Sequence, residues 1–155
     1  MKFALACYGT RGDIEPSAAV GRELLRRGHE VRVAVPPDLV GFVESAGLAA
    51  VSYGPKLEDF LDEEFLRNMW RDFFRSIWTI RGPLRVVRRV WEPIIQYWGD
   101  VSTTLMSLAE GADLLSTGIN FEQPAANVAE YYDIPLATLH HFPMRANGQL
   151  VPSAP

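Results

Sequence analysis

The segment from Gly9 to Pro16 combines residue types that suit the binding of an anion. It reads Gly-Thr-Arg-Gly-Asp-Ile-Glu-Pro and follows a short apolar run at the start of the chain. Gly9 and Gly12 allow a ligand to approach the backbone closely. The helix predicted to begin at Pro16 adds free N–H groups and a favourable dipole. This segment is therefore the first candidate site, and an anion is its candidate ligand.

The same segment also fits a purely structural interpretation. The two glycines can form a tight turn, while Asp13 or Glu15 complements the N-terminus of the following helix. The residues alone leave both interpretations open.

The glycine spacing argues against a nicotinamide dinucleotide. Dinucleotide-binding folds use Gly-x-Gly-x-x-Gly and an acid at the end of the second strand. Here the spacing is Gly-x-x-Gly, and the strand predicted at residues 30–35 runs into Pro36-Pro37-Asp38. Both dinucleotide signals are missing, which disfavours hydride transfer.

A second polar segment is expected at the same edge of the sheet. Asn120, Glu122 and Gln123 precede Pro124, which is again placed to begin a helix. Ligands of doubly wound sheets bind outside the carboxyl ends of the strands. We therefore expect these three side chains to point at the same cleft.

His140 and His141 end the last predicted strand, on the rim that carries Asp13 if the sheet is parallel. For His140 a structural hydrogen bond to a neighbouring loop is favoured. For His141 a structural role and a place in the cleft both stay open, including assistance to Asp13. His29 follows a helix-ending glycine at the opposite end of the sheet and is left out of the site.

Apolar runs alternate with helical patterns through much of the chain. Strands are predicted at residues 3–8, 30–35, 48–53, 112–117 and 135–140. Helices are predicted at residues 16–28, 39–46 and 124–132. This alternation favours parallel pairing through right-handed crossovers. The sequence thus predicts an α/β fold with a Rossmann-like, doubly wound parallel sheet.

Residues 54–110 break the alternation and are predicted to be a helical insertion. Acids at 58–64 are followed by arginines and aromatic residues at 67–98. Aromatic residues at helical spacing favour packing against the domain's own core, whereas the basic and aromatic stripe suits peripheral contact with a membrane. Residues 1–143 are predicted to form one domain, and the polar, Gly- and Pro-containing stretch 144–155 a linker.

Composition narrows the class of protein further. The 155 residues fit a single core, and 15 Lys and Arg against 19 Asp and Glu argue against nucleic-acid binding. Cys7 is the one cysteine, so no internal disulfide forms, and a cytosolic location is expected. No Asp-x-Asp occurs, and the acids at 58–64 alternate with apolar residues like a solvated helix face. No metal ion is expected.

Several of these features together resemble the N-terminal domain of bacterial glycosyltransferases that act on glycopeptide antibiotics, sterols and glycolipids. The resemblance rests on the opening strand, the Gly-Thr-Arg-Gly-Asp-Ile-Glu-Pro segment, Arg27-Gly28-His29-Glu30-Val31 and the Pro36-Pro37 step. It covers residues 1–53 closely and 112–143 loosely. It implies one half of a GT-B type enzyme, in which two Rossmann-like domains face one cleft.

The resemblance also implies roles for particular residues. Asp13 matches the acid that deprotonates the acceptor hydroxyl in an inverting transfer. Thr10 and the backbone near Gly12, with Gly9 and Arg11 beside them, would contact the donor phosphates. The nucleotide sugar would be a co-substrate held mainly by a C-terminal domain that follows this chain, and no cofactor is implied.

The function predicted from sequence is therefore transfer of a sugar from a nucleotide sugar to a hydroxyl of a hydrophobic or polycyclic acceptor. Asn120, Glu122, Gln123 and His141 would line the acceptor cleft. Residues 1–155 alone are expected to be inactive, because transfer needs both substrates held together. The alternative is a non-catalytic Rossmann-like module for nucleotide binding or protein interaction. A second Rossmann-like domain encoded after Pro155 would favour the enzyme.

Overall fold

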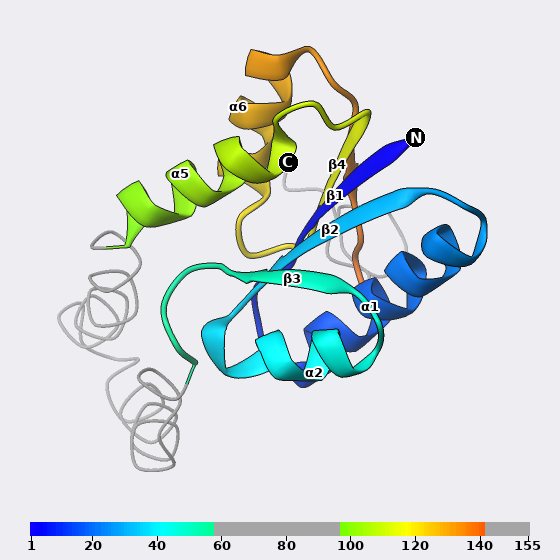
Figure 1. Ribbon diagram of the computed structural model, residues 1–155. Helices are drawn as coiled ribbons and strands as arrows, with labels where there is room; N and C mark the ends of the chain where they lie inside the picture. The colour runs from blue at the N-terminus through cyan, green and yellow to red at the C-terminus, as the bar shows by residue number, and fades with distance from the viewer. Residues whose placement is uncertain (58–96, 142–155) are drawn as a thin grey trace, which may run out of the picture.

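The structure of the chain is a computed structural model that describes residues 1–57 and 97–141 (Figure 1). The patterns predicted within residues 58–96 and the linker at 144–155 lie outside the described residues. All strands and helices named here, and their numbers, refer to these two ranges.

Five parallel strands form one sheet with the order β3-β2-β1-β4-β5. The strands are β1 (Lys2–Ala6), β2 (Glu30–Val35), β3 (Ala49–Ser52), β4 (Leu114–Thr117) and β5 (Leu136–Thr138). Leu5 pairs with Val33 of β2 on one side and with Ser116 of β4 on the other. This sheet confirms the predicted Rossmann-like fold class.

Helices cover both faces of the sheet, as Figure 1 shows. One face carries α1 (Arg11–Arg26) and α2 (Val40–Ser45), the latter preceded by the short 3-10 helix η1 (Pro37–Leu39). The other face carries α5 (Trp98–Ala109) and α6 (Glu122–Tyr132). The strand order reverses direction between β1 and β4, so the crevice of a doubly wound sheet should lie beyond those two strand ends.

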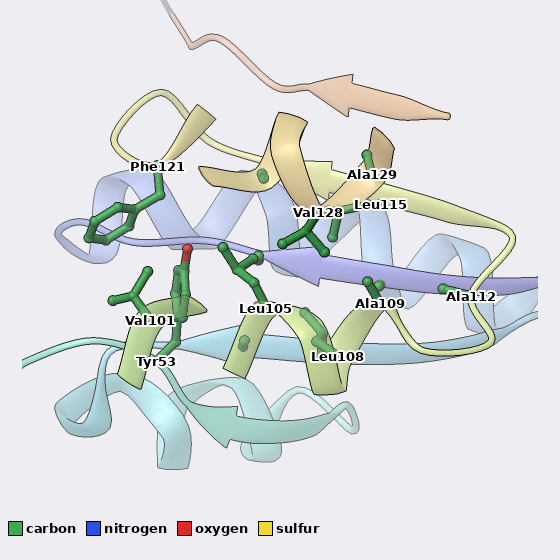
Figure 2. Close-up of a cluster of buried hydrophobic side chains, with 14 residues drawn as sticks. Tyr53, Val101, Leu105, Leu108, Ala109, Ala112, Leu115, Phe121, Val128 and Ala129 are labelled. Carbon is green, nitrogen blue, oxygen red and sulfur yellow. The ribbon is translucent and has the colours of Figure 1, made fainter. Parts of the chain in front are cut away.

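The two faces are packed with opposite distributions of side-chain size. Toward α5 and α6, strands β1 and β2 present alanines. The larger side chains of this cluster come from the helices, such as Leu105 and Val128, and from Leu115 of β4 (Figure 2). Toward α1 the strands present Leu5 and valines, while the helix offers Ala18 and Gly21. A Cβ on Gly21 would lie 3.1 Å from a methyl carbon of Leu5, so this helix needs a small residue there.

Helix α5 lies at the C-terminal end of the predicted insertion and is part of the layered fold. Val101, Leu105 and Leu108 are buried against the sheet and α6. Residues 54–57 at the other end of that segment are a turn and not a helix. The predicted insertion, residues 54–110, therefore includes α5, a helix that covers one face of the sheet.

Helix α1 begins at Arg11, earlier than the predicted start at Pro16. Thr10 is the N-cap, and Asp13 at the third helical position accepts a hydrogen bond from the Thr10 backbone N–H at 2.8 Å. This cap fixes the first turn before Pro16 is reached. Pro16 lies inside the helix, where it removes one backbone hydrogen bond.

Candidate functional site

A pocket opens beyond the carboxyl ends of β1, β4 and β5. Its lining residues come from segments that follow these strands and from the first turn of α1: Cys7, Tyr8, Asp13, Gly118, Ile119, Asn120, Leu139, His140 and His141. The pocket therefore lies at the crevice that the reversal of strand order predicts. We call residues 7–13 the β1–α1 loop and residues 118–123 with 139–141 the β4–β5 rim.

Asp13 is held by Thr10 at the edge of this pocket. The Thr10 backbone N–H and its Oγ1 hydroxyl both donate to Oδ2 of Asp13, at 2.8 and 2.9 Å. Within the described part of the chain, Oδ1 accepts no hydrogen bond. One carboxylate oxygen thus caps the helix, and the other remains available to a ligand. Asp13 therefore caps the helix, as the structural interpretation predicts, and still has one carboxylate oxygen that could accept a proton.

Gly9 is required beneath the Asp13 side chain. It has a φ of +145°, and a Cβ placed on it would lie 2.5 Å from Oδ2 of Asp13. No side chain fits between the backbone and the carboxylate. Gly12 differs, because a Cβ there would meet only the Thr10 hydroxyl at 3.7 Å.

The other residues predicted to contact donor phosphates lie on the exposed first turn of α1 and its N-cap. Thr10, Arg11 and Gly12 are exposed, and none of them lines the pocket. The Arg11 guanidinium lies 4.6 Å from the centre of the Phe42 ring, and its Nε is 3.6 Å from a Glu15 carboxylate oxygen. Arg11 is therefore directed along the surface toward α2. The predicted phosphate contacts stay predictions.

Two hydrogen-bonding contacts join the β4–β5 rim to the β1–α1 loop. Asn120 Nδ2 donates to the Tyr8 carbonyl oxygen at 2.8 Å. His141 Nε2 lies 3.1 Å from the Asp13 carbonyl oxygen, which it can reach as a donor when that nitrogen carries hydrogen. The structure thus brings Asn120 and His141 to the same pocket as Asp13.

Glu122 and Gln123 are not in a loop, because α6 begins at Glu122. Pro124 falls at the third helical position, and its missing N–H costs nothing in the first turn. Gln123 is exposed and donates to Asn127 Oδ1 at 3.4 Å. Neither Glu122 nor Gln123 lines the pocket. The predicted loop between Asn120 and Pro124 is shortened by this early helix start.

His140 lines the pocket, and its side chain faces a residue of a helix and not, as predicted, a loop. Its Nε2 lies 3.4 Å from Oε2 of Glu122. The expected contact was a neighbouring loop. The difference arises because Glu122 belongs to the first turn of α6, which lies beside the end of β5.

Sequence reasoning missed Cys7 and Tyr8 because the first strand was predicted to include them. Strand β1 ends at Ala6, the Cys7 N–H still donates to the Ala34 carbonyl oxygen of β2 at 2.8 Å, and both Cys7 and Tyr8 line the pocket. Cys7 is buried, and desolvation raises the pKa of its thiol to about 11 despite a hydrogen bond with Ser17. It is therefore protonated near neutral pH and a poor nucleophile.

Tyr8 belongs to an aromatic cluster behind the pocket. Its ring meets Phe121 at 5.0 Å and Tyr53 at 6.2 Å between centroids, edge to face. Its hydroxyl donates to the Pro55 carbonyl oxygen at 3.2 Å. Each ring follows a different strand, so this cluster joins the ends of β1, β3 and β4 into one apolar wall.

The described ranges hold neither a cluster of metal-binding side chains nor a helix that could span a membrane. Residues 1–57 and 97–141 contain no group of three or more His, Cys, Asp or Glu side chains that could hold a metal ion. Over the same ranges no helix is long and apolar enough to cross a bilayer.

Fold and pocket together define a Rossmann-like domain that can bind a ligand at the carboxyl edge of its sheet. Residues 3–97 match the glycosyltransferase family 28 N-terminal domain. The chain belongs to this family.

Two curated relatives illustrate the family. An uncharacterized glycosyltransferase of Mycobacterium tuberculosis is 51% identical over 151 residues, covering 97% of this chain and 34% of its own length. The O-mycaminosyltylonolide 6-deoxyallosyltransferase of Streptomyces fradiae is 48% identical over 137 residues, covering 66% of this chain and 32% of its own. The chain spans about a third of the length of these relatives.

The fold is also similar to that of the glycosyltransferase SsfS6 of Streptomyces sp. SF2575, solved with thymidine diphosphate. The TM-score is 0.56 at 22% identity, over 90% of this chain and 38% of that one. At this identity the likeness shows the fold alone.

Proposed function

We propose that this chain is the acceptor-side domain of an inverting glycosyltransferase. The full protein would transfer a sugar from a nucleotide sugar to a hydroxyl of a hydrophobic or polycyclic acceptor. The observation that carries the proposal is the position of Asp13, which lines the pocket at the carboxyl edge of the sheet with one carboxylate oxygen available. Membership of the family supports glycosyl transfer as the reaction class.

Asp13 would act as general base through Oδ1. As the acceptor oxygen bonds to the anomeric carbon, its proton passes to the carboxylate, and the bond from that carbon to the nucleotide diphosphate breaks. Attack from the face opposite the leaving group inverts the anomeric centre. Thr10 keeps the carboxylate oriented through Oδ2, so the same side chain serves the helix and the reaction.

The substrates divide between two domains in this proposal. The exposed N-cap and first turn of α1, with Thr10, Arg11 and Gly12, and the backbone of the buried Gly9 before them, would meet the donor phosphates from the acceptor side. The nucleotide sugar would be held mainly by a C-terminal domain, and no metal ion would be needed. The apolar wall of Tyr8 supports a hydrophobic acceptor, and the name of the Streptomyces fradiae relative, a deoxyallosyltransferase acting on O-mycaminosyltylonolide, supports sugar transfer to a non-protein acceptor.

The test is Asp13→Asn in the full-length protein. The substitution keeps the shape and one capping oxygen but removes the base, so the maximal rate of transfer should fall about 10²-fold or more. Donor affinity should change little. Residues 1–155 alone should give no multiple-turnover transfer, because they lack the donor-side domain.

Asp38→Asn is the matched control. Asp38 follows β2 and lies outside the pocket, and among the described residues its side chain accepts one long hydrogen bond, of 3.4 Å, from the Leu57 N–H. This variant should keep the rate. Near-normal turnover by Asp13→Asn would show that Asp13 merely caps the helix, and loss of folding would equally end the catalytic assignment. A non-catalytic module would then be the better description.

A further inference from the structure

A chain of three polar side chains runs from β5 through α6 to the pocket. Thr138, the last residue of β5, donates its hydroxyl to Oε1 of Glu122 at 3.2 Å. The other oxygen of the same carboxylate, Oε2, lies 3.4 Å from Nε2 of His140. Each oxygen of Glu122 thus faces a different polar group. The arrangement orients Glu122 toward His140.

His140 is the member of this chain that lines the pocket, together with Asp13. Its side chain is 17% exposed, and Nε2 itself is buried without a hydrogen bond among the described residues. A distance of 3.4 Å to Glu122 is longer than a strong hydrogen bond. Such contacts in ligand-free sites often tighten only when the substrate is bound.

The Glu122 carboxylate beside Nε2 favours one tautomer of His140. An ionised carboxylate can only accept, so its position favours hydrogen on Nε2, and a small approach from 3.4 Å would make the pair a hydrogen bond. In the neutral ring the other nitrogen, Nδ1, is then an acceptor. The pair therefore prepares His140 to receive a hydrogen bond from a ligand.

We propose that His140 binds a second hydroxyl of the acceptor, and that Glu122 is its positioning residue. This inference rests on the proposed function. The hydroxyl that receives the sugar has one hydrogen, which it gives to Asp13, so it cannot also donate to His140. The acceptor class is thus a compound with a second hydroxyl close to the one that reacts. His140 selects such diols over matched alcohols.

The experiment uses the full-length protein with estriol and estradiol as acceptors and UDP-glucose or dTDP-glucose as donor. These steroids share a polycyclic frame and differ by one hydroxyl, which in estriol neighbours another. The wild type should prefer estriol in kcat/KM by about 5- to 10-fold, the usual contribution of one neutral hydrogen bond. His140→Phe should remove this preference by raising KM for estriol more than KM for estradiol.

Glu122→Gln tests the positioning role. The amide can still accept from one neighbour but no longer fixes the tautomer of His140, so part of the preference should be lost. His29→Phe is the matched control, because His29 packs against Phe3 at 5.2 Å, outside the pocket. It should keep the full preference. An unchanged preference in His140→Phe, or an equal fall of kcat for both steroids, would overturn the inference.

A second measurement separates this inference from the proposed function. In histidine-labelled full-length protein, the ¹⁵N signals of His140 are identified by their loss in His140→Phe. They should show Nε2 protonated and should shift on addition of estriol but not of estradiol. If the ¹⁵N response to estriol is seen but no sugar is transferred, the proposed function is wrong and the inference stands. If sugar is transferred without this response, the inference is wrong and the proposed function stands. If neither is seen, both are wrong.

Discussion

The β1–α1 loop and the β4–β5 rim meet in one pocket but are assembled over very different distances along the chain. In the loop, Thr10 and Asp13 are three residues apart and hold each other. On the rim, Asn120 reaches Tyr8 across 112 residues and His141 reaches Asp13 across 128. The loop can form together with α1, whereas the rim exists only once β1, β4 and β5 are paired.

This difference has a consequence for how each half tolerates change. The loop depends on the positive φ of Gly9 and on the cap between Thr10 and Asp13, so one added methyl group can disturb it. The rim depends on the position of whole strands, which many buried residues fix together. Substitutions in the loop should therefore cost more than substitutions on the rim.

The largest effect is expected for Gly9→Ala. A positive φ and a Cβ 2.5 Å from Asp13 Oδ2 would both disfavour alanine. The strained backbone and the displaced cap together should lower the free energy of unfolding by about 2–4 kcal/mol, as measured by urea denaturation. Gly12→Ala, three residues on and in open space, is the matched control.

Gly12→Ala should be neutral or stabilise by about 0.5–1 kcal/mol, because alanine is the better helix former. Equal losses for the two variants would mean that the close approach of Gly9 to Asp13 does not exist in solution.

Cys7, where β1 leads into the loop, should give the next effect, visible only at high pH. Burial raises the pKa of its thiol from 9.0 to about 11, so the unfolded chain loses the proton first. The stability that protonation provides is complete below pH 9 and is lost as pH rises through 11. The loss should amount to about 2–3 kcal/mol.

Cys7→Ala isolates this effect, because it removes the titrating group. The difference in unfolding free energy between wild type and variant should shrink by this amount between pH 9 and 11. Burial also raises the pKa of Tyr53 and does so in both proteins, whereas the smaller electrostatic effect of Cys7 on Tyr53 is lost in the variant. A difference that stays constant across this range would show that the thiol is solvated in the native state.

The smallest effect is expected on the rim, for Asn120→Ala. Its hydrogen bond to Tyr8 is exposed and neutral, so its loss should cost about 0.5–1 kcal/mol in urea denaturation. Gln123→Ala is the control, because its long contact with Asn127 stays within one helix. A cost for Asn120→Ala as large as that of Gly9→Ala would contradict the proposed contrast between loop and rim.

Much of the fold could be predicted because its signals are local. The apolar runs, the glycines that end helices and the alternation of strands with helices predict a parallel sheet. Four of the five strands of the described ranges lie within predicted ones, and β1 begins one residue before its predicted start. Strand β2 has the predicted bounds, because Pro36 and Pro37 end it sharply. Asp13 could be selected as a site residue for the same reason, since its segment carries its own pattern.

The boundaries next to the pocket could not be predicted in the same way. The sequence predicts a start of α1 at Pro16, whereas the contact between Thr10 and Asp13 starts the helix at Arg11. Cys7 and Tyr8 look like strand residues, but β1 ends at Ala6, and only the Cys7 N–H still donates to β2, at the Ala34 carbonyl oxygen. Hydrophobicity reports burial, and Cys7 is buried and Tyr8 partly buried although neither belongs to the strand.

The sequence by itself determined the parallel sheet, helices α1, α2 and α6, and the choice of Asp13 in the segment that follows the first strand. Only the tertiary structure decided that His140 faces Glu122, that Asn120 and His141 close on the β1–α1 loop, and that Gln123 turns away. The physical reason is the range of the interactions. Periodicity and capping act within a few residues, whereas the pocket is made where strands distant in sequence end side by side.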